Sequence, residues 1–132
     1  MNVIRPAGIQ EPLPVVVWLH GGAFTHGGSG DARYNLSFIV QNSVEMKQPV
    51  IAVSLNYRLS VWGFLYSWEV AISGAANSGL KDQRLALHWL QENIAAFGGT
   101  YIFIFHFQKN ISDDRFVGDP RKVGHSVVYL QR

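Results

Sequence analysis

The segment LPVVVWLHGGAFTHGGSG, residues 13–30, limits the possible folds more than any other part of this sequence. Its first half, Leu13–His20, is an apolar run with consecutive valines. Such a run is typical of a strand that is buried on both faces, as in parallel sheets. The second half is rich in glycine and has few large side chains, so its backbone N–H groups can approach another group closely.

Two further elements follow this segment. Residues 48–58, QPVIAVSLNYR, predict a second apolar strand that begins at a proline and leaves through Asn56. Between the two strands, residues 35–46 carry apolar side chains at the spacing of one helical face, which predicts a helix. These side chains are Leu36, Ile39, Val40 and Val44.

A longer helix is predicted within NSGLKDQRLALHWLQENIAAFGG, residues 77–99. Gly98 and Gly99 end it, because glycine is the favoured residue just past the last helical turn. The order strand, helix, strand, helix predicts an α/β fold with right-handed crossovers. The residues that recur on one face of the long helix are Leu87, Leu90, Ile94 and Phe97.

The pattern changes after Gly99. Residues 100–117 begin with closely spaced aromatic side chains and continue into the polar stretch QKNISDDR. The two-residue alternation of the aromatic side chains is compatible with a strand, although Ile102 and Ile104 fill the other face. No period links this segment to the preceding elements.

The composition excludes several classes of protein. A chain of 132 residues, 48% of them hydrophobic, is long enough for one domain with a core. Its basic residues are scattered, which argues against a nucleic-acid partner, and it has no cysteine for a disulfide scaffold or a thiolate metal site. No apolar run has the length of a membrane span, and no signal-peptide pattern follows Met1, so the compartment stays unknown.

The glycine-rich loop has several possible functions. Gly22 and Gly27 have the outer glycine spacing of a phosphate-binding P-loop, but no lysine follows to reach the phosphates. His20 and His26 are potential metal ligands, but they lie six apart on a loop with no carboxylate nearby. A mobile turn without any function is a third possibility. It leaves unexplained why His-Gly-Gly-Ala-Phe follows directly at the end of a strand.

An oxyanion hole explains the loop best. Its N–H donors must come within about 2.7–3.1 Å of a developing oxyanion, and neighbouring Cβ atoms would crowd that approach. α/β-Hydrolases use an HGGG-type loop after a buried strand for this purpose.

These motifs resemble the type-B carboxylesterase/lipase family, whose members include fungal lipases and cholinesterases. The matching pieces occur in family order and cover about the first 99 residues. They are NVIRP near the N-terminus, LPVVVWLHGGAF, PVIAVSLNYRLSVWGFL at residues 49–65, and NSGLKDQRLALHWLQENIAAFGG. The resemblance implies the N-terminal part of an α/β-hydrolase fold, including part of its central sheet and the flanking helices.

The resemblance also implies roles for single residues. Gly22 and Ala23 would supply the first two N–H groups of the oxyanion hole. Gly21 would permit the tight turn, and Phe24 would pack beneath the loop. Arg58 and Asp82 would form a buried ion pair of structural importance.

Three side chains of the long helix call for separate interpretations. Trp89 and Phe97 are expected in the core, because large aromatic side chains usually are. His88 is expected on the helix surface or in helix packing. It is not expected to be the catalytic base, which the family places much later in the chain.

The sequence departs from the family after Phe97-Gly98-Gly99. The family continues directly with Asp-Pro, whereas here residues 100–118 intervene before DPRKV, residues 119–123. Removal of these nineteen residues restores FGGDPRKV. At three nucleotides a residue they correspond to 57 nucleotides, so we hypothesise a retained intron. The chain is thereby divided into a partial family domain, residues 1–99, and a divergent tail, residues 100–132.

Ser126 is a poor candidate for the nucleophile. GHSVV, residues 124–128, matches the G-x-S-x-G elbow only up to the serine, because Val128 stands where the last glycine is needed. A frameshift accounts for this tail. Codons that fit Gly124–Val127 encode Val-Thr-Val-Trp when read one base later, which is the type of strand that precedes the family's serine.

The family resemblance implies hydrolysis of carboxylic esters, with a small-molecule or lipid ester as substrate and without a metal or other cofactor. Because family members are several times longer and often secreted, we expect an incomplete piece that is inactive alone. Two alternatives stay open, namely a non-catalytic, cholinesterase-like adhesion or binding protein and a degenerate gene fragment. The oligomeric state and the preferred ester are not predicted.

Overall fold

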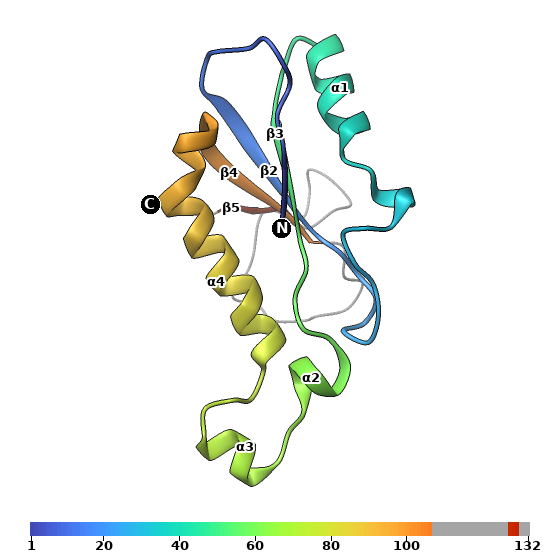
Figure 1. The fold of residues 1–132 in the computed structure, drawn as a ribbon, viewed down its shortest axis with the longest axis vertical. Helices are drawn as coiled ribbons and strands as arrows, with labels where there is room; N and C mark the ends of the chain where they lie inside the picture. The colour runs from blue at the N-terminus through green and yellow to red at the C-terminus, as the bar shows by residue number, and fades with distance from the viewer. Residues whose placement is uncertain (107–126, 130–132) are drawn as a thin grey trace.

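A five-stranded mixed sheet with helices on both sides forms the body of the protein (Figure 1). The computed structural model describes residues 1–106 and 127–129. The sheet order is β1-β3-β2-β4-β5, with β2, β3 and β4 parallel and with the outer strands antiparallel to their neighbours. The strands are β1 (Asn2–Ile4), β2 (Leu13–Leu19), β3 (Ile51–Leu55), β4 (Gly99–His106) and β5 (Val127–Tyr129).

The helices connect the parallel strands. Two of them are long enough to cover the sheet, α1 (Ser37–Glu45) and α4 (Ser78–Asn93). The short helices lie in the connections, and they are η1 (Ala32–Tyr34), α2 (Ser60–Phe64), α3 (Trp68–Ile72) and η2 (Ile94–Phe97). The expected order of strands and helices, and the parallel pairing of the central strands, are confirmed.

The position of β2 between β3 and β4 determines where the helices lie. The β2-α1-β3 connection moves to one side of β2, and the β3-α4-β4 connection returns to the other side. Two crossovers of the same hand that run in opposite directions must place their helices on opposite faces of the sheet. Figure 1 shows α1 and α4 on opposite sides of the strands.

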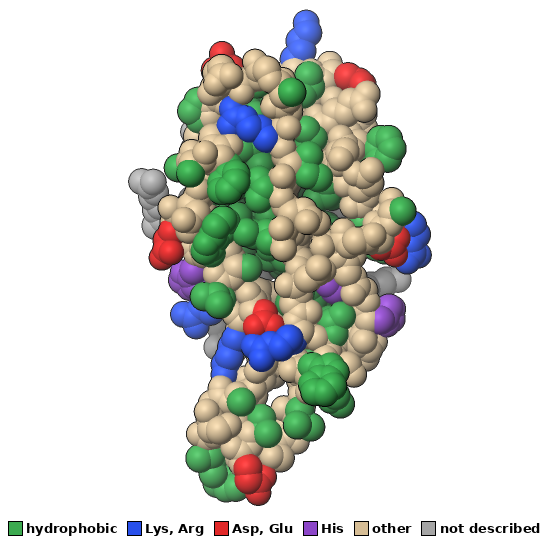
Figure 2. Space-filling model, viewed as in Figure 1, with side chains coloured by type: hydrophobic (Ala, Val, Ile, Leu, Met, Phe, Trp, Pro, Cys, Tyr) green, Lys and Arg blue, Asp and Glu red, His purple; other side chains and the backbone are tan. Residues whose placement is uncertain are grey.

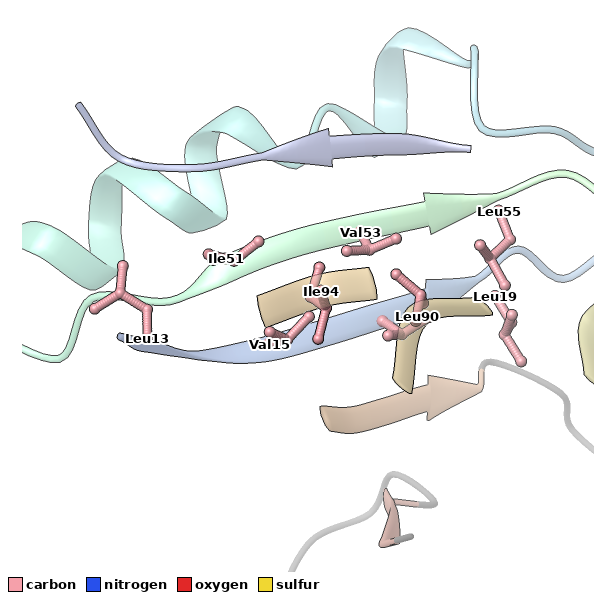
Figure 3. Packing of buried hydrophobic residues seen from close by; sticks show 9 residues of the cluster. Leu13, Val15, Leu19, Ile51, Val53, Leu55, Leu90 and Ile94 are labelled. Atoms are coloured by element: carbon pink, nitrogen blue, oxygen red, sulfur yellow. The ribbon is translucent and has the colours of Figure 1, made fainter. Parts of the chain in front are cut away.

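The core lies mainly between the sheet and α4 (Figure 3). In β2 the odd-numbered residues are buried and the even-numbered ones are half-buried, as the two-residue period of a strand requires. Each fully buried aliphatic side chain contributes roughly 1.5–3 kcal/mol by leaving water. The buried members of this cluster are Leu13, Val15, Val17, Leu19, Ile51, Val53, Leu55, Leu90 and Ile94.

A smaller cluster covers the opposite face. Leu36 and Val40 pack on Ala52 of β3, and Ile4 and Trp18 lie against them. Ile39 and Val44, which the predicted helical face included, are exposed instead, because the short helix α1 turns only a narrow stripe toward the sheet. None of the helices within residues 1–106 is both long and apolar enough to cross a membrane.

The expectation that Trp89 and Phe97 belong to the core is wrong. They are 38% and 44% exposed, and their rings lie 6.3 Å apart at the surface. Trp89 adjoins Leu90, which takes the inward position on α4. Phe97 follows the change from α-helix to the tighter 3₁₀ helix η2, which rotates it away from the face predicted by a constant helical period.

Strand β4 crosses the expected boundary at residue 99. It pairs in parallel with β2, with Val15 opposite Ile102 and Val17 opposite Ile104. The first residues of the divergent tail therefore occupy a strand position beside the centre of the sheet. Residues 107–126, which include most of the tail, lie outside the described part of the chain.

The region of α2 and α3 exposes many apolar side chains. Figure 2 shows hydrophobic side chains at this end of the molecule, with few charged ones among them. Residues 67–76 contain the helix α3 with exposed Trp68 and Ile72. Other exposed apolar residues here are Val61, Trp62, Leu65 and Tyr66.

Candidate functional site

The glycine-rich loop begins at the carboxyl end of β2, next to the end of β3. The connections that leave these two strands run to opposite faces of the sheet, as described above. Open α/β sheets bind their ligands at such a divergence, outside the carboxyl ends of the strands. The loop is therefore located where the topology favours a site.

A tight turn from Gly22 to Thr25 forms the centre of the loop. The Thr25 N–H donates to the Gly22 carbonyl at 3.0 Å, and both central residues have positive φ, 51° at Ala23 and 62° at Phe24. These features define a type I′ turn, in which glycine or asparagine is usual. Alanine and phenylalanine adopt left-handed backbone angles at a cost of about 1–2 kcal/mol each.

Two glycines of the loop are required by close approach of the backbone. A Cβ at Gly22 would lie 1.9 Å from the His26 carbonyl oxygen. A Cβ at Gly27 would lie 2.5 Å from the Gly21 oxygen and 2.6 Å from the His20 ring. Both residues also have φ above 110°, where other residues are strained. The loop is thus a compact structure with sterically defined positions.

The N–H groups of Gly22 and Ala23 have no acceptor among the described residues. An unpaired backbone N–H is uncommon unless it meets water or a ligand. Two adjacent free donors on a constrained turn can bind one negatively charged oxygen atom.

Phe24 anchors the turn to the short helix α2. Its ring lies 4.5 Å from that of Phe64 and 6.4 Å from that of Tyr57, between ring centroids. The Phe24 carbonyl accepts a hydrogen bond from the Ser60 N–H at 2.6 Å. The aromatic contacts and this bond hold the left-handed backbone of the turn in place.

The two histidines of the loop have different environments. His20 is 1% exposed, and its ring stacks on Tyr57 with 4.5 Å between centroids and an angle of 10°. The Tyr57 hydroxyl donates to the His20 carbonyl at 2.7 Å, and burial raises the pKa of Tyr57, which keeps this donor protonated. His26 is exposed, with Nδ1 at 2.9 Å from the Thr25 hydroxyl.

Arg58 and Asp82 join the corner after β3 to α4. The guanidinium lies 2.6 Å from the carboxylate, which also accepts the Arg58 backbone N–H at 3.0 Å. Hydrogen bonds from the Arg58 side chain lower the pKa of Asp82 and raise that of Arg58. The prediction that this pair is buried is wrong for the described part of the chain, because the Arg58 side chain is 54% exposed and the Asp82 side chain is 25% exposed.

The same corner passes between two glycines. A Cβ at Gly63 or at Gly79 would lie 2.2 or 2.4 Å from the Arg58 carbonyl oxygen. Gly63 belongs to α2 and Gly79 to the first turn of α4, so both helices approach the corner closely. His88 lies farther along α4, is exposed and accepts a long contact from Arg84 at 3.4 Å.

Three residues that support the loop have little signal in the sequence. Only residue type points to Tyr57 and Thr25, since tyrosine and threonine hydroxyls are common hydrogen-bond donors. The Asn56 side-chain oxygen accepts the Ser29 N–H at 2.7 Å and holds the far end of the loop. Ser126, the weak nucleophile candidate, lies outside the described residues.

The mixed sheet, its two helical layers and the constrained loop define a partial α/β domain. The chain matches the sequence profile of the carboxylesterase family over residues 1–104, and it belongs to that family.

The relatives of the chain include three fungal lipases. It is 50% identical over 101 residues to Lipase 1 of Geotrichum candidum, covering 75% of this chain and 18% of the relative. Lipase 5 of Diutina rugosa is 43% identical over 135 residues, covering 91% of this chain and 24% of the relative. A secreted triacylglycerol lipase of Gibberella zeae is 41% identical over 101 residues, covering 75% of this chain and 17% of the relative. The chain spans a quarter or less of these relatives.

Replacement of Ala23 by glycine tests the backbone strain of the turn. We expect Ala23→Gly to raise the free energy of unfolding by about 0.5–1 kcal/mol, because relief of the left-handed strain exceeds the entropic cost of glycine. Ala7→Gly is the matched control, since Ala7 is an exposed turn residue without a positive φ. The control should lower stability in urea denaturation. Destabilisation by both substitutions would contradict a strained turn.

The Asp82 carboxylate predicts a pH-dependent stability. Its lowered pKa means that its stabilisation is complete above the ordinary value of 3.8 and is lost as the pH falls through the folded value. We therefore expect Asp82→Asn to lower the urea midpoint at pH 7, with a difference from wild type that shrinks as the pH falls below about 4.

The control for this experiment is Asp31→Asn. Asp31 pairs with Arg33 only two residues away, so this ion pair connects no separate elements and its loss should change the midpoint less. An Asp82→Asn effect of equal size at pH 7 and at pH 2 would argue that the charge of the carboxylate is unimportant.

Proposed function

We propose that this chain is the oxyanion-loop part of an α/β-hydrolase that cleaves carboxylic esters, with a small-molecule or lipid ester as substrate. One observation carries the proposal. The N–H groups of Gly22 and Ala23, which have no acceptor among the described residues, lie on a strained turn at the carboxyl end of the central parallel strand. Membership of the carboxylesterase family, and relatives that are named lipases, support the same chemistry.

In this reaction a serine hydroxyl attacks the ester carbonyl and forms a tetrahedral intermediate. A histidine oriented by a carboxylate takes the serine proton and passes it to the leaving alcohol. The carbonyl oxygen gains negative charge in this step, and the N–H groups of Gly22 and Ala23 would donate hydrogen bonds to it. Loss of a single such donor typically costs about 10²–10³ in rate.

Ser126 does not serve as the nucleophile in this proposal. A nucleophile elbow leads from a strand through a sharp turn into a helix. Here the residues directly after Ser126 form the strand β5, which pairs with Phe103–Phe105 of β4. This strand and Val128 at the glycine position both argue against an elbow at Ser126. We therefore expect no ester turnover by the isolated chain.

An assay with p-nitrophenyl esters tests this assignment. The purified 132-residue chain is expected to show no turnover above the buffer background. The Ser126→Ala variant should give the same rate as the unmodified chain. Turnover by the chain that disappears in Ser126→Ala would show that the tail contains a working nucleophile.

A retained intron at residues 100–118 and a frameshift after Val123 would separate the chain from its nucleophile. The similarity to Lipase 5 of Diutina rugosa covers 91% of the chain and therefore includes part of the tail. DPRKV after this insertion matches the family pattern that follows FGG.

Transcript sequencing tests both the gene structure and the type of protein. We expect mature message without the 57 nucleotides of residues 100–118, and a downstream frame that encodes Gly-Glu-Ser-Ala-Gly. Retention of the 57 nucleotides in mature message would exclude the intron. A residue other than serine at the elbow would instead favour a binding protein.

A further inference from the structure

The direction of each free N–H in the loop is determined by the carbonyl of its own peptide group. A trans peptide is planar, so the C=O of one residue and the N–H of the next point in opposite directions. The hydrogen bonds of the Gly21 carbonyl therefore orient the Gly22 N–H. In the same way, the hydrogen bonds that the Gly22 carbonyl accepts orient the Ala23 N–H.

His20 holds the Gly21 carbonyl. Its Nδ1 lies 2.9 Å from the Gly21 oxygen, and since a carbonyl can only accept, Nδ1 must carry the proton. The stack on Tyr57 fixes the plane of the ring, and the Gly27 backbone covers this bond so closely that no side chain fits there.

The other ring nitrogen of His20 argues against a packing role. Nε2 is buried and has no hydrogen-bond partner among the described residues. Leaving a polar atom unpaired in the interior destabilises the fold, whereas phenylalanine would stack on Tyr57 without this cost. The hydrogen bond from Nδ1 is what histidine provides and phenylalanine lacks.

Thr25 holds the Gly22 carbonyl. Its hydroxyl and its backbone N–H both lie 3.0 Å from the Gly22 oxygen, and the His26 N–H lies at 3.3 Å. Because the hydroxyl has one proton and donates it to Gly22, the contact with His26 Nδ1 at 2.9 Å requires that the imidazole donates to Thr25. The two side chains form a short hydrogen-bonded chain that ends on the carbonyl.

We propose that His20 and Thr25 are two separate positioning residues, His20 for the Gly22 N–H and Thr25 for the Ala23 N–H. This inference rests on the proposed oxyanion function of these two donors. Each side chain acts on a different peptide group, so the two donors can be misdirected one at a time. Neither side chain contacts the substrate in this role.

Residual dipolar couplings in NMR test the proposal, because they report the direction of each N–H bond in the full 132-residue chain. We expect His20→Phe to change the coupling of Gly22 and to leave that of Ala23 unchanged. Thr25→Val should change the coupling of the Ala23 N–H and leave the coupling of the Gly22 N–H unchanged. His20→Asn and Thr25→Ser retain a donor and should restore the wild-type couplings.

Two results would overturn the proposal. One is an unchanged Gly22 coupling in His20→Phe, and the other is an equal change of both couplings in either variant, as a general collapse of the turn would produce. If His20→Phe does not fold, the ¹⁵N shifts of the wild-type imidazole decide, since protonation at Nε2 instead of Nδ1 contradicts the bond to Gly21.

The couplings are measured without substrate. They therefore stay informative if ester hydrolysis is disproved for this family member, and their failure would leave the proposed reaction untouched.

Discussion

The burial of β2 in the middle of the parallel sheet is the constraint on which the rest of the structure depends. Its odd-numbered side chains are fixed against α4, and its backbone is hydrogen-bonded to a strand on each side. The end of the strand at Leu19 is consequently rigid, and so is the start of the glycine-rich loop. A donor on a loop can be directed accurately only if the element before it does not move.

Three consecutive residues after β3 transmit this rigidity to the loop. Asn56 accepts the Ser29 N–H at the far end of the loop, and Tyr57 donates to the His20 carbonyl at its beginning. Arg58 binds Asp82 and so attaches the same corner to α4. The side chains of these three neighbours thus reach three different parts of the molecule. The parallel pairing of β2 and β3 brings this corner beside the loop.

The sequence predicted the elements that have a clear period, and it failed where the period changes or where distant contacts decide. The strand at residues 13–20 and the long helix were predictable because apolar spacing is a local property. The exposure of Phe97 was not, since it depends on the change to a 3₁₀ helix. The position of β4 beside β2 was also ambiguous, because alternating aromatic and aliphatic residues do not show which strand will be the neighbour.

The candidate site was predictable in composition but not in mechanism. Glycine after a buried strand indicated a close approach of the backbone, and the family resemblance indicated which N–H groups are involved. In the proposed arrangement the orientation of those groups depends on Tyr57, which lies 37 residues from its partner His20. Likewise, the positive φ of Ala23 and Phe24 has no signal in the sequence, because both residue types normally avoid such angles.

The proposed oxyanion role would account for the use of alanine and phenylalanine at these positions. Glycine would adopt the same backbone angles with less strain, but it would also gain access to many others and leave the donors less well oriented. Phe24 compensates for part of the strain through its contacts with Phe64 and Tyr57. A turn of this kind sacrifices stability to limit the conformations of two N–H groups, which is favourable where charge develops at a fixed point. In a turn that only reverses the chain direction, the loss of stability would have no compensating benefit.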